Sequence, residues 1–442
     1  MGAKLYPAYR DSGVEWIGEI PEHWEVKRLK DACVQSALYG ANIAATDYVQ
    51  DGVRFLRTTD ITDNGNLLAS GVYVPKSLAL DYMLQTGDIL ISRSGTVGRA
   101  LLFNKNLHGE CSYAGYLVRF VPRRSLYPRF FFLFTKSAIF GDFLKLTAIS
   151  STIENVNGEK YANCAFPSPP LEEQKQIAAF LDRETSKIDT LIEKKQQLIN
   201  LLKEKRGSLI SHTVTKGLNP NAPMKDSGVE WIGEIPKHWE VKPLRHLGRC
   251  QNGLNIGGDA FGSGSPFVSY SDVYKNTVLP SAVKGLVESS ETDWISYSVQ
   301  RGDVLFTRTS ETIDDIGMAS TCLETIPKAT FAGFLIRFRP IRSLDCRFSK
   351  HYFSNPRIRA FFAGQMVIIT RASLSQDLLK QLPVLLPPES EQIEIFDFLD
   401  RETGKIDELV IKANQSIALL KERRSSLISA AVTGKIDVRE AA

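Results

Sequence analysis

The sequence lacks the features that would place the protein in a membrane or outside the cell. It has no run of about 18 apolar residues, and its start, MGAKLYPAYRDSG, has neither the apolar core of a secretion signal nor the serine or threonine of a myristoylation site. The six cysteines are scattered and form no CxxC pair. We therefore expect reduced thiols in a cytoplasmic protein with no membrane partner.

Motifs for catalysis are also missing. The GxxxxGK[ST] motif of ATP hydrolysis does not occur, and the Asn-Pro pairs at Asn219 and Asn355 are not followed by the second proline and aromatic residue of an adenine or cytosine amino-methylase. The turn SGTVG at 94–98 can cradle a phosphate, but the second half of the chain lengthens it, which favours a structural turn. The ExK spacings at 25–27 and 240–242 have no identifiable acidic partner for a nuclease metal ion. We predict no catalytic residues and no metal site.

What the sequence does contain is an internal repeat. DSGVEWIGEIPEHWEVKRL at 11–29 returns as DSGVEWIGEIPKHWEVKPL at 226–244 with 17 of 19 positions identical, so the protein consists of two copies of a unit of about 215 residues. The tryptophans of this block are expected to anchor a turn. Acidic and histidine side chains beside them suggest a metal or acid–base site, but surface-turn residues are the favoured interpretation: Glu15, Glu19, His23 and Glu25.

Each copy ends in a long helix. Residues 171–216 contain no proline and one glycine and follow several prolines, and 389–435 repeat the pattern. A polar helix of this length buries a narrow apolar seam best by pairing, and a twofold relation between the copies makes the pair antiparallel. Packing of each helix on its own domain is the alternative. The predicted seam follows two rows in each helix with a heptad spacing of seven residues, and one row of each helix also contains an arginine, Arg206 or Arg424. The seam consists of Ile188, Ile192, Ile199, Leu202, Leu209, Ile406, Val410, Ile417, Leu420 and Leu427.

The remainder of each copy predicts a compact α+β domain. Short apolar strands, such as 114–122 and its counterpart 332–340, alternate with a few helices, such as 131–144 and 351–362. The two copies differ most in polar turns rich in Ser, Thr, Asn, Gly and Arg, as in 36–52. A shared framework with different loops suggests one binding scaffold adapted to two targets.

Polar residues at strand ends are the candidate contacts of this scaffold, and the family resemblance that the features below carry implies DNA as the ligand. Arginine in such a position can form two hydrogen bonds with guanine, although Arg93 and Arg308 can equally hold phosphates or pair with an acid. The candidates in the first domain are Thr58, Thr59, Arg93, Ser94 and Thr96. Those in the second domain are Tyr270, Ser271, Arg308, Thr309, Thr370 and Arg371.

Three features together resemble one family. They are the tandem unit, the opening W-I-G-E-I-P-x-H-W at 16–24 and 231–239, and the helix entries PPLEEQKQIAAFLDRET at 169–185 and PPESEQIEIFDFLDRET at 387–403. The arrangement resembles the specificity subunit of type I restriction-modification enzymes. The resemblance implies two target-recognition domains, at 1–170 and 218–388, two spacer helices, at 171–217 and 389–435, and a tail at 436–442.

The resemblance also implies a function. A non-catalytic subunit is expected, in which each domain reads one half of a split, asymmetric site in double-stranded DNA. Two methylation subunits are expected to dock on the helices, and restriction subunits to join them. The resemblance places S-adenosylmethionine, ATP and Mg on those partners and no cofactor on this chain. A stand-alone DNA-modifying enzyme and a coiled-coil scaffold that does not bind DNA are the alternatives.

Overall fold

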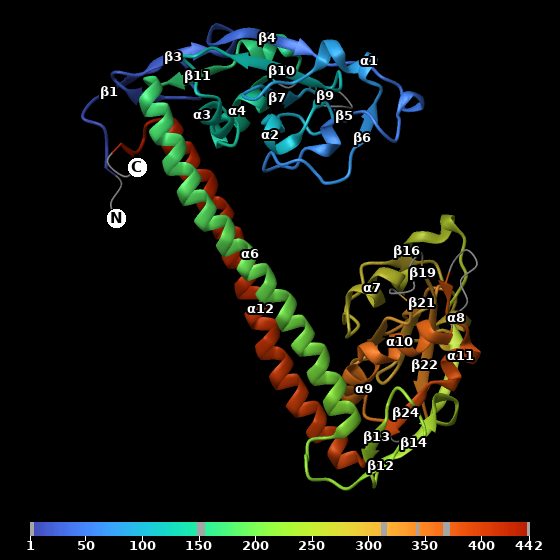
Figure 1. Cartoon of the computed structure of the whole chain (residues 1–442). Coiled ribbons are helices and arrows are strands. Elements are labelled where there is room, and N and C mark those ends of the chain that lie inside the picture. Colours follow the sequence, from blue (N-terminus) through green and yellow to red (C-terminus); the bar gives the residue numbers. More distant parts are fainter. Residues whose placement is uncertain (1–3, 148–154, 311–315, 342–343, 366–371, 440–442) are drawn as a thin grey trace. The chain divides into compact units, whose positions relative to one another are not determined.

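The protein divides into two compact units. The structure, a computed structural model, describes residues 4–147, 155–310, 316–341, 344–365 and 372–439. One unit comprises residues 1–195 and 414–442, and the other comprises residues 196–413. Each unit thus contains one globular domain and about half of each long helix, α6 (Leu171–Lys216) and α12 (Glu389–Val432), which are labelled in Figure 1.

The first domain is built on a four-stranded antiparallel sheet in the order β4-β10-β7-β8. A three-stranded sheet, β6-β5-β9, contains one parallel pair, β5 with β9, and two ribbons pair β1 with β2 and β3 with β11. The strands are β1 (Tyr9–Asp11), β2 (Glu19–Pro21), β3 (Glu25–Arg28), β4 (Cys33–Tyr39), β5 (Val53–Leu56), β6 (Val72–Val74), β7 (Ile89–Ser92), β8 (Ala100–Leu102), β9 (Cys111–Tyr113), β10 (Leu117–Pro122) and β11 (Ala165–Ser168).

The helices of the first domain are short. They are α1 (Lys76–Ala79), α2 (Lys105–His108), α3 (Pro128–Phe134), α4 (Ala138–Thr147) and α5 (Gly158–Ala162). The helix predicted over 131–144 is therefore two helices. The break has a local cause, because the hydroxyls of Thr135 and Ser137 donate to carbonyls at the end of α3 and Ser137 Oγ then accepts the Phe140 N–H at the start of α4.

The second domain repeats this topology. Its sheets run β15-β22-β18-β20 and β17-β16-β21, again with one parallel pair, and its ribbons pair β12 with β13 and β14 with β24. An added pair, β19 with β23, stands where the first domain has a single bridge between Ser94 and Asn155. The strands are β12 (Met224–Asp226), β13 (Glu234–Pro236), β14 (Glu240–Pro243), β15 (Gly248–Asn252), β16 (Phe261–Val268), β17 (Leu286–Val287), β18 (Val304–Thr307), β19 (Thr309–Ser310), β20 (Ala319–Thr321), β21 (Thr330–Phe331), β22 (Leu335–Pro340), β23 (Ala372–Ser373) and β24 (Pro383–Leu386).

Its helices are α7 (Tyr270–Lys275), α8 (Glu291–Ser296), α9 (Cys346–Phe353), α10 (Pro356–Gln365) and α11 (Gln376–Gln381). The helix predicted over 351–362 is also divided, because Pro356 has no N–H to continue α9 and instead begins α10. None of the described helices combines the length and apolar character needed to span a bilayer.

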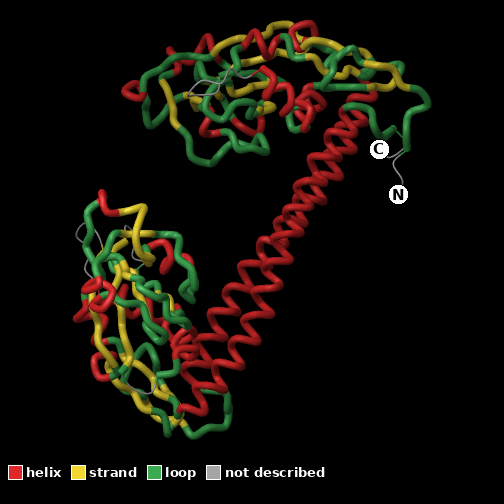
Figure 2. The backbone as a smooth tube through the Cα atoms, turned by 180° about the vertical axis from the view of Figure 1, so that it is seen from behind, coloured by secondary structure: helices red, strands yellow, loops and turns green. Residues whose placement is uncertain are grey.

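The two long helices are each continuous (Figure 2) and run antiparallel in both units. In the first unit, Ile177 and Leu181 of α6 share a core with Ile428 and Val432 of α12. In the second unit, the other ends meet, and Ile210 and Val214 share a core with Ile395 and Leu399. All ten predicted seam residues are buried or half-buried.

Equivalent ion pairs fix the register of the helices in each unit. Asp189 Oδ1 accepts from Arg424 Nε at 2.9 Å in the first unit, and Asp407 Oδ1 accepts from Arg206 Nε at 3.0 Å in the second. Both arginines occupy positions in the heptad rows, at the edge of the apolar seam, where the alkyl part of the side chain can pack while the guanidinium reaches the partner helix.

The block repeated at the start of each copy binds the start of the long helix that ends the copy. In the first unit, the Trp24 indole N–H donates to Glu173 Oε1 at 3.1 Å, and His23 Nε2 lies 2.9 Å from Glu173 Oε2. Gln174, next along α6, accepts the Tyr127 N–H and donates to two carbonyls. The helix entry and the tryptophan block therefore form one clamp, which we call the Trp–Glu clamp.

The second unit builds the same clamp. The Trp239 indole donates to Glu391 Oε2 at 2.7 Å, His238 contacts the other carboxylate oxygen, and Gln392 accepts the Asp345 N–H. Both tryptophans are fully buried. The clamp explains why tryptophan, histidine, glutamate and glutamine recur in both copies, and it supports the structural interpretation of His23.

Candidate nucleic-acid interface

The first element of the candidate interface is a capped turn in each domain. After β5, Asp60 Oδ2 accepts the Arg57 N–H at 2.9 Å, and after β16, Asp272 Oδ2 accepts the Ser269 N–H at 2.8 Å. Each aspartate thereby closes the turn that carries two predicted DNA contacts. These are Thr58 and Thr59 in the first domain, and Tyr270 and Ser271 in the second.

The two turns differ in shape and in side chains. The first is a 3-10 turn, whose Arg57 guanidinium also binds Asp60, and this hydrogen bond is the main cause of the raised pKa of Arg57. The second begins helix α7, so Tyr270 and Ser271 lie in the first turn of a helix. On α7 the rings of Tyr270 and Tyr274 stack with centroids 5.9 Å apart. The same backbone cap thus presents small hydroxyls in one domain and a stacked tyrosine in the other.

The second element is the arginine that follows the central strand. The Arg93 N–H donates to the Tyr116 carbonyl at 2.9 Å, and the Arg308 N–H donates to the Phe334 carbonyl at 2.9 Å. The guanidinium of Arg93 lies over the Tyr39 ring, 5.0 Å from its centroid, and the Tyr39 hydroxyl is itself held by the Gly158 N–H. Among the described residues Arg93 has no acidic partner, so the interpretation as half of an ion pair has no support there.

The third element is a pair of loops that pack against each other. Gly115 donates its N–H to Ala41, and Gly333 donates its N–H to Leu254. A Cβ on Gly115 would lie 2.3 Å from Asn42 Oδ1, so any larger residue would displace the Asn42 amide. The contact places Asn42 beside the turn that ends in Tyr116. In the second domain, Asn255 takes the same place beside Gly333 and Phe334.

The aromatic residue at the tip of this turn projects from each domain. Tyr116 is 64% exposed and Phe334 is 63% exposed, although both follow a buried Ala-Gly segment. In the first domain, Tyr116 and Asn42 line a groove of about 550 Å³ together with Thr58 and Thr59. Thr58 Oγ1 is buried and has no hydrogen-bond partner among the described residues, whereas Thr59 is exposed. The groove thus presents hydroxyl, amide and aromatic groups to a ligand.

An ion pair with a buried aspartate supports the strand before Arg93 and the strand before Arg308. Arg119 on β10 binds Asp88 at 2.7 Å, and Arg339 on β22 binds Asp303 at 2.6 Å. In the first domain, burial raises the pKa of Asp88. In the second domain, burial lowers the pKa of Arg337, which lies near Arg339 and Asp303, to about 10. Each aspartate also accepts a backbone N–H in the turn before its strand. These charges hold the framework rather than line the groove.

Comparison with known proteins finds one family of similar proteins. Residues 21–201 match the model of the type I restriction modification DNA specificity domain. The chain is 24% identical to the type I restriction enzyme EcoKI specificity subunit of Escherichia coli K12 over 95% of this chain and 90% of that protein. Over nearly its whole length the chain is similar to specificity subunits of type I restriction enzymes.

Two solved structures share the fold. A chain described under complex assembly and conformational transition of the type I R-M system aligns with a TM-score of 0.68 and 17% identity, over 94% of this chain and 99% of that one. The HsdS subunit from Thermoanaerobacter tengcongensis aligns with a TM-score of 0.51 and 16% identity, over 94% and 98% of the two chains. Both likenesses concern the fold, which in this chain consists of two similar α+β domains and two long helices.

The structure brings some of the predicted contact residues together. In the first domain, Thr58 and Thr59 line the groove, and the Arg93 N–H donates to the carbonyl of Tyr116, which also lines it. The turn at 94–98 follows Arg93, but Gly98 donates its N–H to Ser92 and packs on Leu144, as a structural turn would. Ser94 and Thr96 are not among the residues that line the groove, and Thr309 lies in β19. Thr370 and Arg371 lie outside the described residues.

Four residues of the interface were not identified from the sequence. They are Asn42, Tyr116, Asn255 and Phe334. A signal was present, because Gly-x-Asn-Ile occurs at 40–43 and 253–256, within stretches that otherwise differ, and Ala-Gly-aromatic-Leu occurs at 114–117 and 332–335. The second motif was interpreted only as part of a strand. We call the reading face of the first domain Asn42, Thr58, Thr59, Arg93 and Tyr116, and that of the second Asn255, Tyr270, Ser271, Arg308 and Phe334.

The candidate nuclease residues have a simpler role. Lys27 Nζ lies 2.9 Å from Glu25 Oε2, and Glu240 and Lys242 pair in the same way. The hydrogen bond from Lys27 is the main reason why the pKa of Glu25 is lowered. Among the described residues, no group of three or more histidine, cysteine, aspartate and glutamate side chains is arranged to hold a metal ion.

Proposed function

We propose that each reading face binds one half of a split DNA target and that its side chains distinguish the bases. The observation that carries the proposal is a conserved backbone with changed side chains. Both domains keep the aspartate cap, the arginine and its bond to the aromatic tip, whereas Thr58 and Thr59 are replaced by Tyr270 and Ser271. Two such faces suit two different half-sites in one chain.

The chemistry of the reading faces suits the grooves of duplex DNA. Arginine can donate two hydrogen bonds to guanine, asparagine can bind adenine with two, and threonine hydroxyls can bond either base or pack a methyl group against thymine. The exposed ring of Tyr116 or Phe334 offers an apolar surface to a base edge or base step. A net charge of +4 for the chain leaves most of the attraction to phosphates to local groups and partners.

We place catalysis on partner subunits. The sequence has no methylase or ATPase motif, and the relatives are described as specificity subunits. S-adenosylmethionine, ATP and Mg would accordingly be held by methylation and restriction subunits, and this chain would recognise the DNA target sequence. A cytoplasmic location follows from that role.

The long helices offer two equivalent docking positions for methylation subunits. Leu191 and Leu201 on α6 are 47% and 61% exposed, and the equivalent Leu409 and Leu419 on α12 are 51% and 66% exposed. Leucines outside the seam have no role in pairing the helices, and exposed apolar groups at regular positions typify a protein interface. Because the positions recur in both copies, we propose that two copies of one partner bind. Replacing Leu191 and Leu409 with glutamate should abolish assembly with the methylation subunit, measured by gel filtration.

A transplant between the domains tests the proposed reading of DNA. In the chain assembled with its methylation subunit, Tyr270→Thr, Ser271→Thr and Phe334→Tyr give the second face side chains of the first. We expect the second half of the methylated sequence to change and the first half to remain, as measured by mapping methylated bases in a host. The matched control is the reverse change at Thr58, Thr59 and Tyr116, which should alter the first half only. Alteration of both halves by either variant would contradict independent reading.

A further inference from the structure

The two Trp–Glu clamps are built from equivalent residues, but only the first is covered. The Glu173 side chain is 6% exposed, whereas the Glu391 side chain is 34% exposed. The difference does not come from the clamp, since tryptophan and histidine bind the carboxylate in both units. It comes from the chain segments that lie over the clamp.

In the first unit, a tyrosine covers the carboxylate. The Tyr6 hydroxyl donates to Glu173 Oε1 at 2.7 Å, and its ring packs 5.7 Å from both the His23 and the Trp24 rings. Burial raises the pKa of Tyr6, with a further contribution from Glu173, so the hydroxyl keeps its proton and remains a donor. The Arg439 guanidinium lies over the other face of the site, 4.9 Å from the Tyr6 ring centroid.

Two separate segments bring these side chains together. Residues 4–6 approach along one path and residues 434–439 along another, and the Asp437 N–H donates to the Lys4 carbonyl at 2.7 Å. Tyr9 also donates its hydroxyl to the Gly434 carbonyl at 3.0 Å. The occupant of this clamp is therefore a peptide segment that carries a tyrosine.

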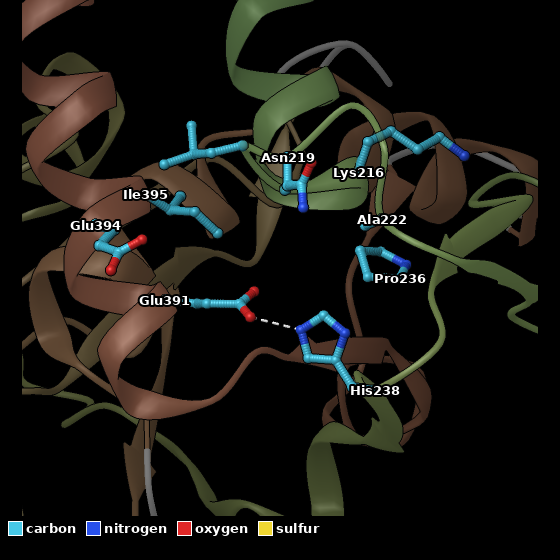
Figure 3. A pocket seen from close by; sticks show the side chains of 10 residues that line it. Lys216, Asn219, Ala222, Pro236, His238, Glu391, Glu394 and Ile395 are labelled. Atoms are coloured by element: carbon cyan, nitrogen blue, oxygen red, sulfur yellow. Dashed lines mark hydrogen bonds and ion pairs between the residues drawn. The ribbon is translucent and has the colours of Figure 1, made fainter.

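In the second unit, one continuous loop replaces both segments and leaves a pocket. The loop at 217–223 connects α6 to β12, and Asn221 takes the position of Tyr6, counted back from the repeated block. Asn221 is exposed, and its N–H donates a hydrogen bond to Asn219 Oδ1 at 3.0 Å. Figure 3 shows the resulting pocket, with Glu391 and His238 on one side and Asn219, Ala222 and Ile395 around it.

The size and chemistry of the pocket match one aromatic hydroxyl group. Its volume is about 160 Å³, close to the ~150 Å³ of a cavity that takes up a benzene ring. Each Glu391 oxygen accepts one hydrogen bond from the clamp, and a carboxylate oxygen has room for a second, as Glu173 Oε1 shows by accepting from both Tyr6 and Trp24.

We propose that the pocket beside Glu391 is a receptor for a tyrosine side chain presented by a protein partner, which completes the second clamp as Tyr6 completes the first. The hydroxyl donates to Glu391, and the ring lies on His238. The nature of the partner rests on the proposed function, in which methylation subunits assemble on this chain. The recognition of an aromatic hydroxyl does not depend on that function.

The pocket is tested first with the full chain alone and 4-methylphenol, the side chain of tyrosine. By ligand-observed NMR titration, we expect one molecule per wild-type chain, none with Ala222→Phe, which fills the pocket, and two with Tyr6→Ala, which empties the matching site. Toluene, which lacks the hydroxyl, and the variant Glu391→Gln should each reduce affinity about tenfold, the loss of a hydrogen bond to a charged group. No binding to wild type, or equal binding of toluene, overturns the proposal.

The second measurement identifies the source of the hydroxyl. In the complex with the methylation subunit, wild type should no longer bind 4-methylphenol, whereas the site created by Tyr6→Ala should stay available. If the second pocket still takes up the probe in the assembled complex, the proposal of a partner tyrosine is overturned and a small-molecule site remains. DNA methylation by the same complex is read separately, so failure of the proposed function is distinguished from failure of the pocket.

Discussion

The two domains of this chain are alike where they join the long helices and differ at their reading faces. At the Trp–Glu clamps, the tryptophan, histidine and glutamate and the hydrogen bonds among them are the same, because each clamp joins a domain to its long helix, although a tyrosine covers the first clamp only. At the reading faces, backbone hydrogen bonds are retained while the side chains between them change. The comparison shows that a hydrogen-bonded frame can be kept while the groups it presents are exchanged, which is what a family of DNA-reading subunits requires.

The largest expected effect is at the clamps, where the two units should behave alike. Trp24→Ala and Trp239→Ala each remove a fully buried indole and should lower the free energy of unfolding of their own unit by ~3–5 kcal/mol. Denaturant titration followed by hydrogen exchange of each unit measures the loss. A difference of more than about 2 kcal/mol between the two variants would show that the clamps are not equivalent.

Low pH should lower the stability of the second unit more than that of the first, because of His351. His351 is buried in α9 where the first unit has Leu133, and burial, with Lys350 and Arg206 nearby, lowers its pKa to about 4, against the opposing effect of Asp400. Above pH 6.5 the imidazole is neutral in both states. As pH falls from 6.5 to 4, the unfolded state binds the proton first, and stability is lost.

The expected loss is about 3 kcal/mol for the second unit, given 1.36 kcal/mol per pKa unit. His351→Leu, which copies the first unit, should remove this part of the acid sensitivity. Unfolding of wild type and variant at pH 7 and pH 4 provides the measurement. Equal pH dependence of the two proteins would mean that His351 does not stay neutral when buried.

At the reading faces, equivalent substitutions in the two units should affect different halves of the DNA site. Arg93→Ala should cost ~1–3 kcal/mol of discrimination in the first half-site, and Arg308→Ala the same in the second. Binding of the assembled methyltransferase to duplexes with single substitutions in each half-site measures the effect. If either variant weakens all duplexes equally, that arginine holds phosphate and does not read a base.

The smallest effect concerns the ion pairs between the long helices. Asp189→Asn and Asp407→Asn each remove one partner of an equivalent, partly exposed pair, and each should lower stability by ~0.2–1 kcal/mol. Thermal unfolding at low and high salt measures the change, which should shrink as salt rises. An effect that does not depend on salt would assign these residues a packing role.

Much of the fold could be predicted from the sequence because its signals are local and repeated. The heptad spacing and the prolines before each helix predicted α6 and α12. The repeated block predicted two units with the same topology. The strand end at Arg93 and the turn at Thr58 were also visible, since an apolar run followed by polar residues is a strong signal. The breaks after α3 and α9 were missed, because side-chain hydroxyls and one proline outweighed the apolar pattern.

The sequence by itself determined the tandem unit, the long helices and the type of residue at the strand ends, because these depend on composition and spacing along the chain. Only the tertiary structure decided that the tryptophan block binds the helix entry, that Tyr116 and Asn42 join the groove, and that one clamp is filled while its twin is open. These contacts join residues far apart in the chain, such as Trp24 and Glu173. Their partners are chosen by the packing of whole elements, which no local pattern encodes.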